Sequence, residues 1–301
     1  MTGRVLVPWT QNRDNAPDGL RVEVYDGSAE PPVDLDDVVF YVLPYGAEPV
    51  DLMRRMPRLR AAQLLTAGYE HAVNALPEGA SLYNGRGLHD ASTAEHALGL
   101  ILAAQRELPL WAAEQSRHSW DPHYTRSLAD SRVLIVGYGS IGEAIEARLL
   151  PFETDVVRLA RRPRPDADVY GIDALHGLLP EADVVVIVAP HTPATEGLVG
   201  AAELALLRDD ALVVNVGRGP VLDTAALLAE NGRIRAALDV TDPEPLPPGH
   251  PLWDAPGVYL TPHVAGGSAT FYPRARRFVD EQLRRWSVGE PLLNRVALDH
   301  G

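Results

Sequence analysis

The sequence predicts an α/β protein with a doubly wound parallel sheet in one domain and a second, smaller α/β domain. Three observations support this fold class. Short strand-like runs alternate with helical stretches along the whole chain, as they do in parallel sheets with crossover helices. The run RVLIVG at residues 132–137 is a continuous apolar strand that ends in glycine, which is typical of a strand covered on both faces. The length of 301 residues is enough for two domains of ordinary size.

Residues 1–94 are expected to form the smaller parallel α/β domain, because short strands alternate there with turns and amphipathic pieces. We predict a helical piece over Val50–Met56, between the third and fourth strands. The predicted strands are Arg4–Val7, Arg21–Tyr25, Val38–Leu43, Ala62–Leu65 and Ser81–Tyr83.

A long, buried helix is predicted over Ser92–Arg106, where apolar residues recur at helical spacing and serine and threonine can cap the start. We expect Glu95 and His96 on this helix to be packing and hydrogen-bonding residues. The stretch that follows, to about residue 129, is interpreted as an arm that packs on another surface, such as a second subunit. It holds three large aromatic side chains, Trp111, Trp120 and Tyr124.

From Arg132 onward the alternation is clearer and predicts six strands with crossover connections, the pattern of a doubly wound sheet. After RVLIV, the predicted strands are Asp155–Leu159, Asp183–Ala189, Ala211–Val216, Arg235–Val240 and Val258–Leu260. The predicted helices between them include Glu143–Leu150, Ala201–Leu207 and Thr224–Glu230. A further helix over about Ser268–Val288 is expected to return the chain toward the first domain.

The composition excludes several classes of function. A net charge of −14 argues against a general nucleic-acid or membrane surface as partner. Because the chain has no cysteine, thiol nucleophiles, disulfides and cysteine-based zinc sites are excluded. All 27 basic residues are arginine, which removes a Schiff-base lysine and the lysine of a P-loop.

The location and the absence of a metal are also expectations from the sequence. No apolar run has the length of a membrane span, and the segment MTGRVLVPWTQNRDN lacks the apolar core of a signal peptide. We therefore expect a cytoplasmic protein. No metal is expected, because the spacing of His118, Asp121 and His123 fits no metal-binding motif, and we interpret these residues as a surface cluster.

A glycine-rich turn, GYGSIG, follows the strand Val133–Val136 and opens a helix. In that context the pattern G-x-G-x-x-G predicts a dinucleotide site. The first glycine permits a tight turn, the second lets the backbone approach a diphosphate, and the third lets helix and strand pack closely. The diphosphate then faces the helix N-terminus. The predicted cofactor-binding residues of this turn are Gly137, Tyr138, Gly139, Ser140, Ile141 and Gly142.

The second strand of this domain indicates which dinucleotide binds. NAD sites carry an acidic residue roughly 20 residues after the turn, where it holds the ribose 2′-hydroxyl. Here Ala160 stands at the strand end and Arg161 and Arg162 follow, and arginines suit a 2′-phosphate. We therefore favour NADP(H) over NAD(H); the alternative is a solvated pair of arginines.

Three polar residues each follow a predicted strand, namely Arg218, Glu244 and His263. Because ligands of open α/β sheets bind at the carboxyl ends of the strands, we expect these side chains in one crevice. A carboxylate favours the protonated form of a neighbouring imidazole, and a guanidinium binds an anion. The three residues therefore predict proton transfer on a small acid. Taken singly, each has a plainer interpretation: a surface arginine, a solvated glutamate or a structural histidine.

Several segments in order resemble the D-isomer-specific 2-hydroxyacid dehydrogenases, including glyoxylate/hydroxypyruvate reductases, and they extend over nearly the whole chain. Two of them, LLTAGYEH at 64–71 and TAEHALGLILA at 93–103, precede the glycine turn. The others are GYGSIG at 137–142, VVVIVAPHTPATEGLV at 184–199, LVVNVGRGPVLDTAAL at 212–227, ALDVTDPEPLPPGHPLW at 237–253 and TPHVAGGS at 261–268.

The resemblance implies a Rossmann domain over 95–281 and a discontinuous flavodoxin-like substrate domain over 1–94 and 282–301. It places the active site in the cleft between these domains. It implies hydride transfer between NAD(P)H and a small 2-oxo acid, giving a D-2-hydroxy acid. The implied assembly is a homodimer through the dinucleotide-binding domains.

By the same resemblance, Arg218 matches the arginine of N-x-x-R-G, Glu244 the acid of D-V-x-x-x-E-P, and His263 the histidine of P-H-x-x-G. The spacing from Asp239 selects Glu244 rather than Asp242 as the acid. His263 would then donate a proton, Glu244 would orient its ring, and Arg218 would bind the substrate carboxylate and polarise the carbonyl group.

Further contacts follow from the resemblance alone. The backbone at Ala67 and Gly68 should hold the substrate carboxylate, together with Arg218 and His263. Asp239 should approach the nicotinamide carboxamide. Beyond the glycine turn and the two arginines, the implied cofactor contacts are Ala189, Pro190, Thr195, Val216, Gly217, Asp239 and Gly266.

The chain also departs from the family pattern. His191 stands where an apolar residue is usual and is interpreted either as lining the pocket near the cofactor phosphates or as a surface substitution; Thr241 replaces a common aromatic. Formate dehydrogenases are disfavoured because they carry glutamine where Glu244 stands, and phosphite dehydrogenases because they use a lysine. A phosphoglycerate dehydrogenase-like activity and a dinucleotide-sensing corepressor-type protein with little turnover stay open as alternatives.

Overall fold

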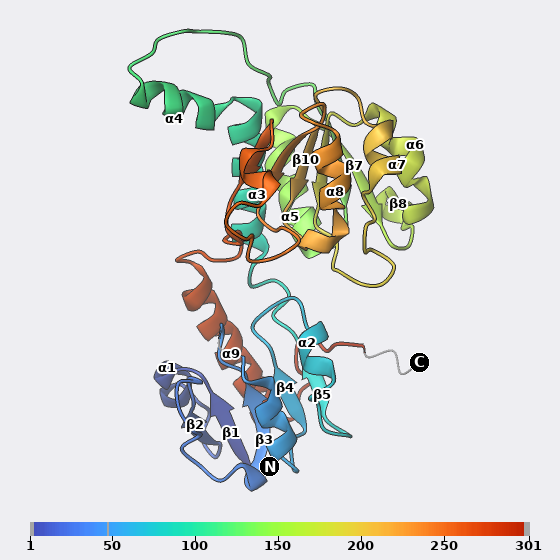
Figure 1. The fold of residues 1–301 in the computed structure, drawn as a ribbon. Coiled ribbons are helices and arrows are strands. Elements are labelled where there is room, and N and C mark those ends of the chain that lie inside the picture. The colour runs from blue at the N-terminus through green and yellow to red at the C-terminus, as the bar shows by residue number, and fades with distance from the viewer. Residues whose placement is uncertain (1–2, 47, 298–301) are drawn as a thin grey trace. The chain divides into compact units, whose positions relative to one another are not determined.

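The structure is a computed structural model that describes residues 3–46 and 48–297. The chain divides into two compact units, one of Met1–His89 with Ala269–Gly301 and one of Asp90–Ser268 (Figure 1). The predicted substrate domain also includes residues 1–2, 47 and 298–301, which lie outside the described residues. Each unit has a parallel sheet with helices, which confirms the predicted fold class.

The divisions between the units fall at the starts of two helices. α3 spans Asp90–Gln105 and α9 spans Phe271–Val288. The predicted divisions, after residues 94 and 281, therefore lie inside these helices. α9 groups with the first unit because its apolar residues pack on the sheet of that unit.

The first unit is built on a five-stranded parallel sheet with the order β2-β1-β3-β4-β5. This order is that of flavodoxin-like folds. The segment predicted as helical at residues 50–56 is a 3-10 helix over Val50–Arg55. The strands are β1 (Arg4–Val7), β2 (Arg21–Val24), β3 (Val38–Val42), β4 (Ala61–Gln63) and β5 (Ser81–Tyr83), and the short helices are α1 (Thr10–Asp14) and α2 (Glu70–Val73).

Helix α9 covers one face of this sheet because its apolar residues recur every three or four positions. Its buried stripe packs against β1 and β3, and the rings of Trp286 and Phe40 lie with their centroids 5.1 Å apart. The opposite face is covered by the 3-10 helix and α2, through residues such as Met53 and Ala72. The stripe of α9 consists of Phe271, Ala275, Val279, Leu283 and Trp286.

The second unit is built on a seven-stranded parallel sheet with the order β12-β11-β10-β9-β6-β7-β8. From β6 the chain moves out to β8 and then returns to β9 on the other side of β6, so the strand order reverses there. Ligands of doubly wound sheets bind at such a switch point, beyond the carboxyl ends of the strands. The strands are β6 (Arg132–Val136), β7 (Asp155–Ala160), β8 (Val169–Gly171), β9 (Val184–Ile187), β10 (Leu212–Asn215), β11 (Arg235–Leu238) and β12 (Val258–Leu260).

Helices cover both faces of the seven-stranded sheet (Figure 1). On one face, α3 and α5 pack on alternate residues of the central strands, such as Ile135 of β6. On the other face, α6, α7 and α8 pack on the intervening residues, such as Leu134. Because both faces are buried, these strands are nearly continuous apolar runs in the sequence. The helices are α5 (Ser140–Leu149), α6 (Leu175–Leu178), α7 (Ala201–Leu206) and α8 (Thr224–Ala229).

Strand β8 corrects the prediction of six strands in this sheet. Its three residues, Val169–Gly171, pair with β7 at the edge of the sheet. Only Val169 is buried, and Tyr170 is half exposed. Such a short edge strand gives no apolar run or alternation in the sequence, so the pattern used for the other strands does not detect it.

The arm after α3 buries little of its apolar surface within the described residues. α4 (Leu108–Ser116) has no buried residue, Trp120 is 94% exposed, and Tyr124 is fully exposed. The His123 ring packs at a tilt against Trp111, with the centroids 4.5 Å apart, and Nε2 of His123 lies 2.7 Å from Oε2 of Glu107. Over residues 3–46 and 48–297, no group of three or more His, Asp or Glu side chains could hold a metal, and no helix has the length and apolar character to cross a membrane.

Candidate active site

The glycine turn stands at the carboxyl end of β6, beside the point where the strand order reverses. Gly137 has a φ of +108°, a backbone conformation that residues other than glycine rarely adopt. A Cβ at this position would lie 2.5 Å from the backbone nitrogen of Ala189, after β9. Glycine is therefore required here, both for the turn and for the close approach of the β9 loop.

The N-terminus of α5 has features that suit an anionic ligand. A Cβ at Gly139 would meet no atom within 4 Å, so the turn has open space on that side. Among the described residues, no acceptor faces the backbone N–H groups of Ser140, Ile141 and Gly142. Unpaired N–H groups at a helix N-terminus suit a phosphate. These features fit the diphosphate of a dinucleotide.

The turn is braced by a cluster of charged side chains around Tyr138. The Tyr138 hydroxyl donates a hydrogen bond to Glu146, which also accepts from Arg158 at 2.6 Å. Burial, and then the bond to Glu146, raises the pKa of Tyr138 to about 12. Arg164 lies over the Tyr138 ring, 5.4 Å from its centroid, and donates to the Tyr138 carbonyl.

Two exposed arginines follow the end of β7. β7 ends at Ala160, and no acidic residue stands where an NAD site would hold the ribose 2′-hydroxyl. Arg161 and Arg162 are exposed, and neither has a hydrogen-bond or ion-pair partner among the described residues. The chemistry of this strand end therefore fits an anionic group such as a 2′-phosphate.

Other predicted cofactor residues follow β9 and β10, which lie on one side of β6 in the sheet. The loop after β9 is held by Thr195, whose hydroxyl donates to the Pro190 carbonyl at 2.7 Å. Nε2 of His191 is shielded from solvent and has no partner among the described residues. Four of these residues lie in loops: Ala189 and Pro190 after β9, and Val216 and Gly217 after β10.

Arg218 is presented by a tight loop after β10. Asn215 fixes this loop, since its side chain donates to the Arg218 carbonyl at 3.0 Å and accepts from the Gly217 N–H at 3.0 Å. A Cβ at Gly219 would lie 1.9 Å from the Thr241 carbonyl oxygen, so this position also requires glycine. The Arg218 guanidinium donates to the Gly217 carbonyl at 2.7 Å, and no carboxylate of the described residues pairs with it. Its charge is available for an anionic ligand.

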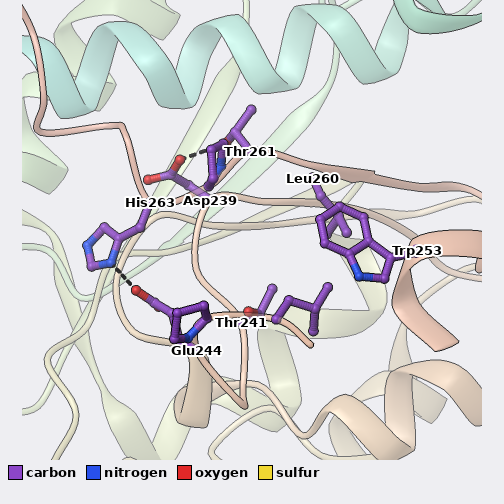
Figure 2. Close-up of a pocket in the computed structure, with 10 residues that line it drawn as sticks. Asp239, Thr241, Glu244, Trp253, Leu260, Thr261 and His263 are labelled. Carbon is purple, nitrogen blue, oxygen red and sulfur yellow. Dashed lines mark hydrogen bonds and ion pairs between the residues drawn. The ribbon is translucent and has the colours of Figure 1, made fainter. Parts of the chain in front are cut away.

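Glu244 and His263 meet although they come from loops after different strands (Figure 2). Nδ1 of His263 lies 2.5 Å from Oε1 of Glu244. Both side chains are partly exposed, with fractions of 46% for His263 and 39% for Glu244. Among the described residues, Nε2 of His263 has no partner, and no hydrogen bond joins Arg218 to this pair. Among the described residues, Glu244 and not Asp242, the alternative acid, forms the ion pair with His263.

Asp239 lies directly behind the histidine turn. Asp239 as a whole is only 2% exposed. Oδ1 accepts hydrogen bonds from the Thr261 hydroxyl at 2.6 Å and the Val264 N–H at 3.0 Å, and Oδ2 accepts from the Ala265 N–H at 2.9 Å. A carboxylate oxygen can accept two bonds, so Oδ2 keeps a free position. This capacity fits the predicted contact with a carboxamide.

A cavity of about 410 Å³ opens beside the acid–base pair. Figure 2 shows His263 and Glu244 on one side of it, with Trp253 and Leu260 facing them. The apolar wall was not predicted from the sequence. Its signal is weak, because Leu246 and Trp253 stand in a proline-rich loop with no strand or helix periodicity.

The predicted carboxylate loop lies in the first unit, after β4. The Thr66 hydroxyl donates to the Gly68 carbonyl at 2.9 Å, and Asn84 donates to the Ala67 carbonyl at 2.7 Å. The N–H groups of Ala67 and Gly68 have no acceptor among the described residues. These two donors fit a small anion; their part in substrate binding stays a prediction.

A glycine turn at the switch point of a doubly wound sheet, with an imidazole–carboxylate pair at neighbouring strand ends, defines a dinucleotide-dependent oxidoreductase. Comparison with known proteins agrees. Residues 98–265 match the family model of the D-isomer specific 2-hydroxyacid dehydrogenase NAD binding domain, which covers more than half of the chain. A glyoxylate/hydroxypyruvate reductase B from Citrobacter koseri is 35% identical over 240 residues, 74% of this chain and 72% of that protein.

Solved structures are similar over nearly the whole chain. A D-isomer specific 2-hydroxyacid dehydrogenase from Xanthobacter autotrophicus Py2, in complex with NADPH and MES, has a TM-score of 0.82 at 31% identity and covers 99% of this chain and 98% of its own. An NADPH-dependent glyoxylate/hydroxypyruvate reductase from Sinorhizobium meliloti, in complex with NADP and sulfate, has a TM-score of 0.83 at 27% identity, with 98% of each chain covered. The chain belongs to the D-isomer specific 2-hydroxyacid dehydrogenase family and is an NAD(P)-dependent oxidoreductase.

Proposed function

We propose that this enzyme reduces a small 2-oxo acid to the D-2-hydroxy acid with NADPH, as a glyoxylate/hydroxypyruvate reductase does. The observation that carries the proposal is the contact between His263 and Glu244, which leaves Nε2 of the imidazole free for a substrate. Relatives with glyoxylate/hydroxypyruvate reductase activity in their names support this substrate class.

In the proposed mechanism, Glu244 accepts a hydrogen bond from Nδ1 and so orients the imidazole. Nε2 of His263 then donates a proton to the carbonyl oxygen as negative charge develops there. Arg218 binds the substrate carboxylate and polarises the carbonyl group. The hydride for the carbonyl carbon comes from the bound nicotinamide dinucleotide, which is thereby oxidised.

The preference for NADP(H) is part of the proposal. Two guanidinium groups without a partner among the described residues follow β7, and the sequence has no carboxylate at the end of this strand. A carboxylate there would repel a 2′-phosphate, whereas arginine can bind it through two hydrogen bonds. The structures in complex with NADPH or NADP support this preference.

We also propose a homodimer. The arm after α3 exposes large apolar side chains, and aromatic residues are enriched in protein interfaces. The exposed side chains are Leu108, Leu110, Trp120 and Tyr124. A second copy that covered them would remove this apolar surface from water.

A panel of 2-oxo acids assayed with NADPH and with NADH tests the proposal. We expect turnover of glyoxylate or hydroxypyruvate, with a higher kcat/KM for NADPH. Turnover of 3-phosphohydroxypyruvate alone would instead support the phosphoglycerate dehydrogenase-like activity. Binding of NADPH without turnover of any acid would support a dinucleotide sensor, and a clear preference for NADH would contradict the cofactor assignment.

A further inference from the structure

The catalytic histidine of the proposed mechanism stands on a strained turn. His263 has a φ of +51°, in the left-handed region. This conformation is strained for a residue other than glycine and persists only where its surroundings hold it. The direction of the imidazole therefore depends on the contacts that fix residues 261–265.

Asp239 provides these contacts from the end of β11. Its carbonyl accepts a hydrogen bond from the His263 N–H at 2.7 Å. Its carboxylate accepts from the next two backbone N–H groups, those of Val264 and Ala265. One residue thus holds three successive residues of the turn. Because this carboxylate is buried, its own position depends on the donors that surround it.

His96 of α3 completes that set of donors. Its Nε2 lies 3.0 Å from the Thr261 hydroxyl oxygen and 3.3 Å from Oδ1 of Asp239. The Thr261 hydroxyl has one proton, and it gives that proton to Oδ1 of Asp239 at 2.6 Å. The hydroxyl oxygen must therefore accept from His96, which assigns the proton of this imidazole to Nε2 (Figure 2 shows the bond between Thr261 and Asp239).

We propose that His96 is a positioning residue for His263. Its Nε2–H orients the Thr261 hydroxyl and the Asp239 carboxylate, and these in turn fix the strained turn that aims the His263 imidazole at a substrate. His96 itself does not touch His263, since Asp239 and Thr261 lie between them in this chain of hydrogen bonds. The inference rests on the proposed role of His263 as the proton donor.

Two substitutions separate positioning from plain packing. Leucine at position 96 keeps an apolar side chain on α3 but removes the donor, and glutamine supplies an N–H at similar reach. We expect His96→Leu to lower kcat about tenfold, the effect of losing roughly one hydrogen bond to a charged group. We expect His96→Gln to recover most of that loss.

The control is His176→Leu. His176 also pairs with a carboxylate in the same unit, through Nε2 and Oε1 of Glu203, 2.7 Å apart. This control should leave kcat unchanged. Thr261→Val removes the intermediate hydroxyl at nearly constant shape, so its effect on kcat should not add to that of His96→Leu in the double variant.

The imidazole NMR signals of His263 give a readout that needs no turnover. They should shift in His96→Leu and return toward their original positions in His96→Gln. Unchanged kcat and unchanged His263 signals in His96→Leu would overturn the inference. So would equal losses in the leucine and glutamine variants. If the wild-type enzyme turned over no 2-oxo acid, the proposed function would fail, and the His263 signals would still decide whether His96 positions the turn.

Discussion

Nδ1 of His263 lies 2.5 Å from Oε1 of Glu244, across two loops that follow different strands of one sheet. The pair leaves the second imidazole nitrogen without a partner among the described residues. An imidazole held in this way by a carboxylate can be kept in one orientation and donate a proton from the far nitrogen.

Removing either member of the pair should therefore impair turnover more than folding. His263→Asn should lower kcat by at least about 10²-fold, the usual effect of a lost general acid. Glu244→Gln should also lower kcat, because a neutral amide makes a weaker hydrogen bond to Nδ1 than a carboxylate does and so holds the imidazole less firmly. Steady-state kinetics check both effects, with Asp242→Asn as the control. Near-wild-type turnover in His263→Asn, or in Glu244→Gln, would contradict the proposed roles.

The two arginines after β7 should decide between the dinucleotides. Replacing Arg161 and Arg162 by serine should lower kcat/KM for NADPH by at least about tenfold, since the loss of even one hydrogen bond to a charged group costs roughly 1.5–3 kcal/mol. The value for NADH should change little, because NADH has no 2′-phosphate. Arg208→Ser is the control: its guanidinium pairs with Asp183 at the amino end of β9. Equal losses with both dinucleotides would show that the arginines do not select NADPH.

Much of the fold is predictable because buried parallel strands leave a clear trace in the sequence. The strands β6, β9 and β10 are covered by helices on both faces and appear as apolar runs. β8 escapes prediction because a three-residue edge strand needs little apolar surface. The extent of α9 is visible in its apolar spacing, but its membership of the first unit depends on which sheet it covers.

The residues of the site also fall into those that the sequence predicts and those that it does not. The strand ends and motif spacings predict Arg218, Glu244 and His263 because each follows an element that the sequence reveals. The contact of His96 with Thr261 joins residues 165 positions apart, and only the packing of α3 beside the carboxyl end of β12 brings them together. The wall formed by Trp253 is likewise set by a loop without periodicity.

Replacing His191, in the loop after β9, should affect the stability of the free enzyme and the binding of NADPH in ways that can be measured separately. Its Nε2 is buried without a partner among the described residues, and an unsatisfied buried polar group costs about 1–3 kcal/mol. His191→Leu should therefore raise the Tm of the free enzyme by roughly 2–4 °C for each kcal/mol gained. If a bound dinucleotide contacts this nitrogen, adding NADPH should raise the Tm of His191→Leu by less than it raises the Tm of the wild type. An equal increase in both proteins, measured by thermal melts, would indicate that His191 has no role in cofactor binding.

Tyr41 in β3 gives a prediction for stability and its pH dependence. Its hydroxyl is buried and has no partner among the described residues, and burial raises its pKa well above the usual value near 10. Tyr41→Phe should therefore stabilise the enzyme at neutral pH by about 1 kcal/mol.

The sign of the pH effect follows from the raised pKa. Above about pH 10 the unfolded state loses the tyrosine proton while the folded state keeps it, so stability falls as pH rises. Tyr41→Phe should lessen this fall. Urea unfolding at pH 7 and at about pH 10.5 measures both effects. Tyr170→Phe, at an exposed hydroxyl, is the control; a Tyr41→Phe variant less stable than the wild type at both pH values would show that the hydroxyl has a partner.

We expect a homodimer to depend on the exposed aromatic side chains of the arm after α3. Trp120 and Tyr124 are nearly or fully exposed in the single chain, and truncation of a buried aromatic residue at an interface centre often costs about 2 kcal/mol or more. Replacing both by alanine should therefore raise the dissociation constant of a homodimer at least about tenfold. Sedimentation equilibrium at several protein concentrations measures it, with Tyr170→Ala as the control for an exposed aromatic on the edge strand β8. A monomeric wild-type enzyme, or an undisturbed dimer in the double variant, would show that the second copy does not cover this arm.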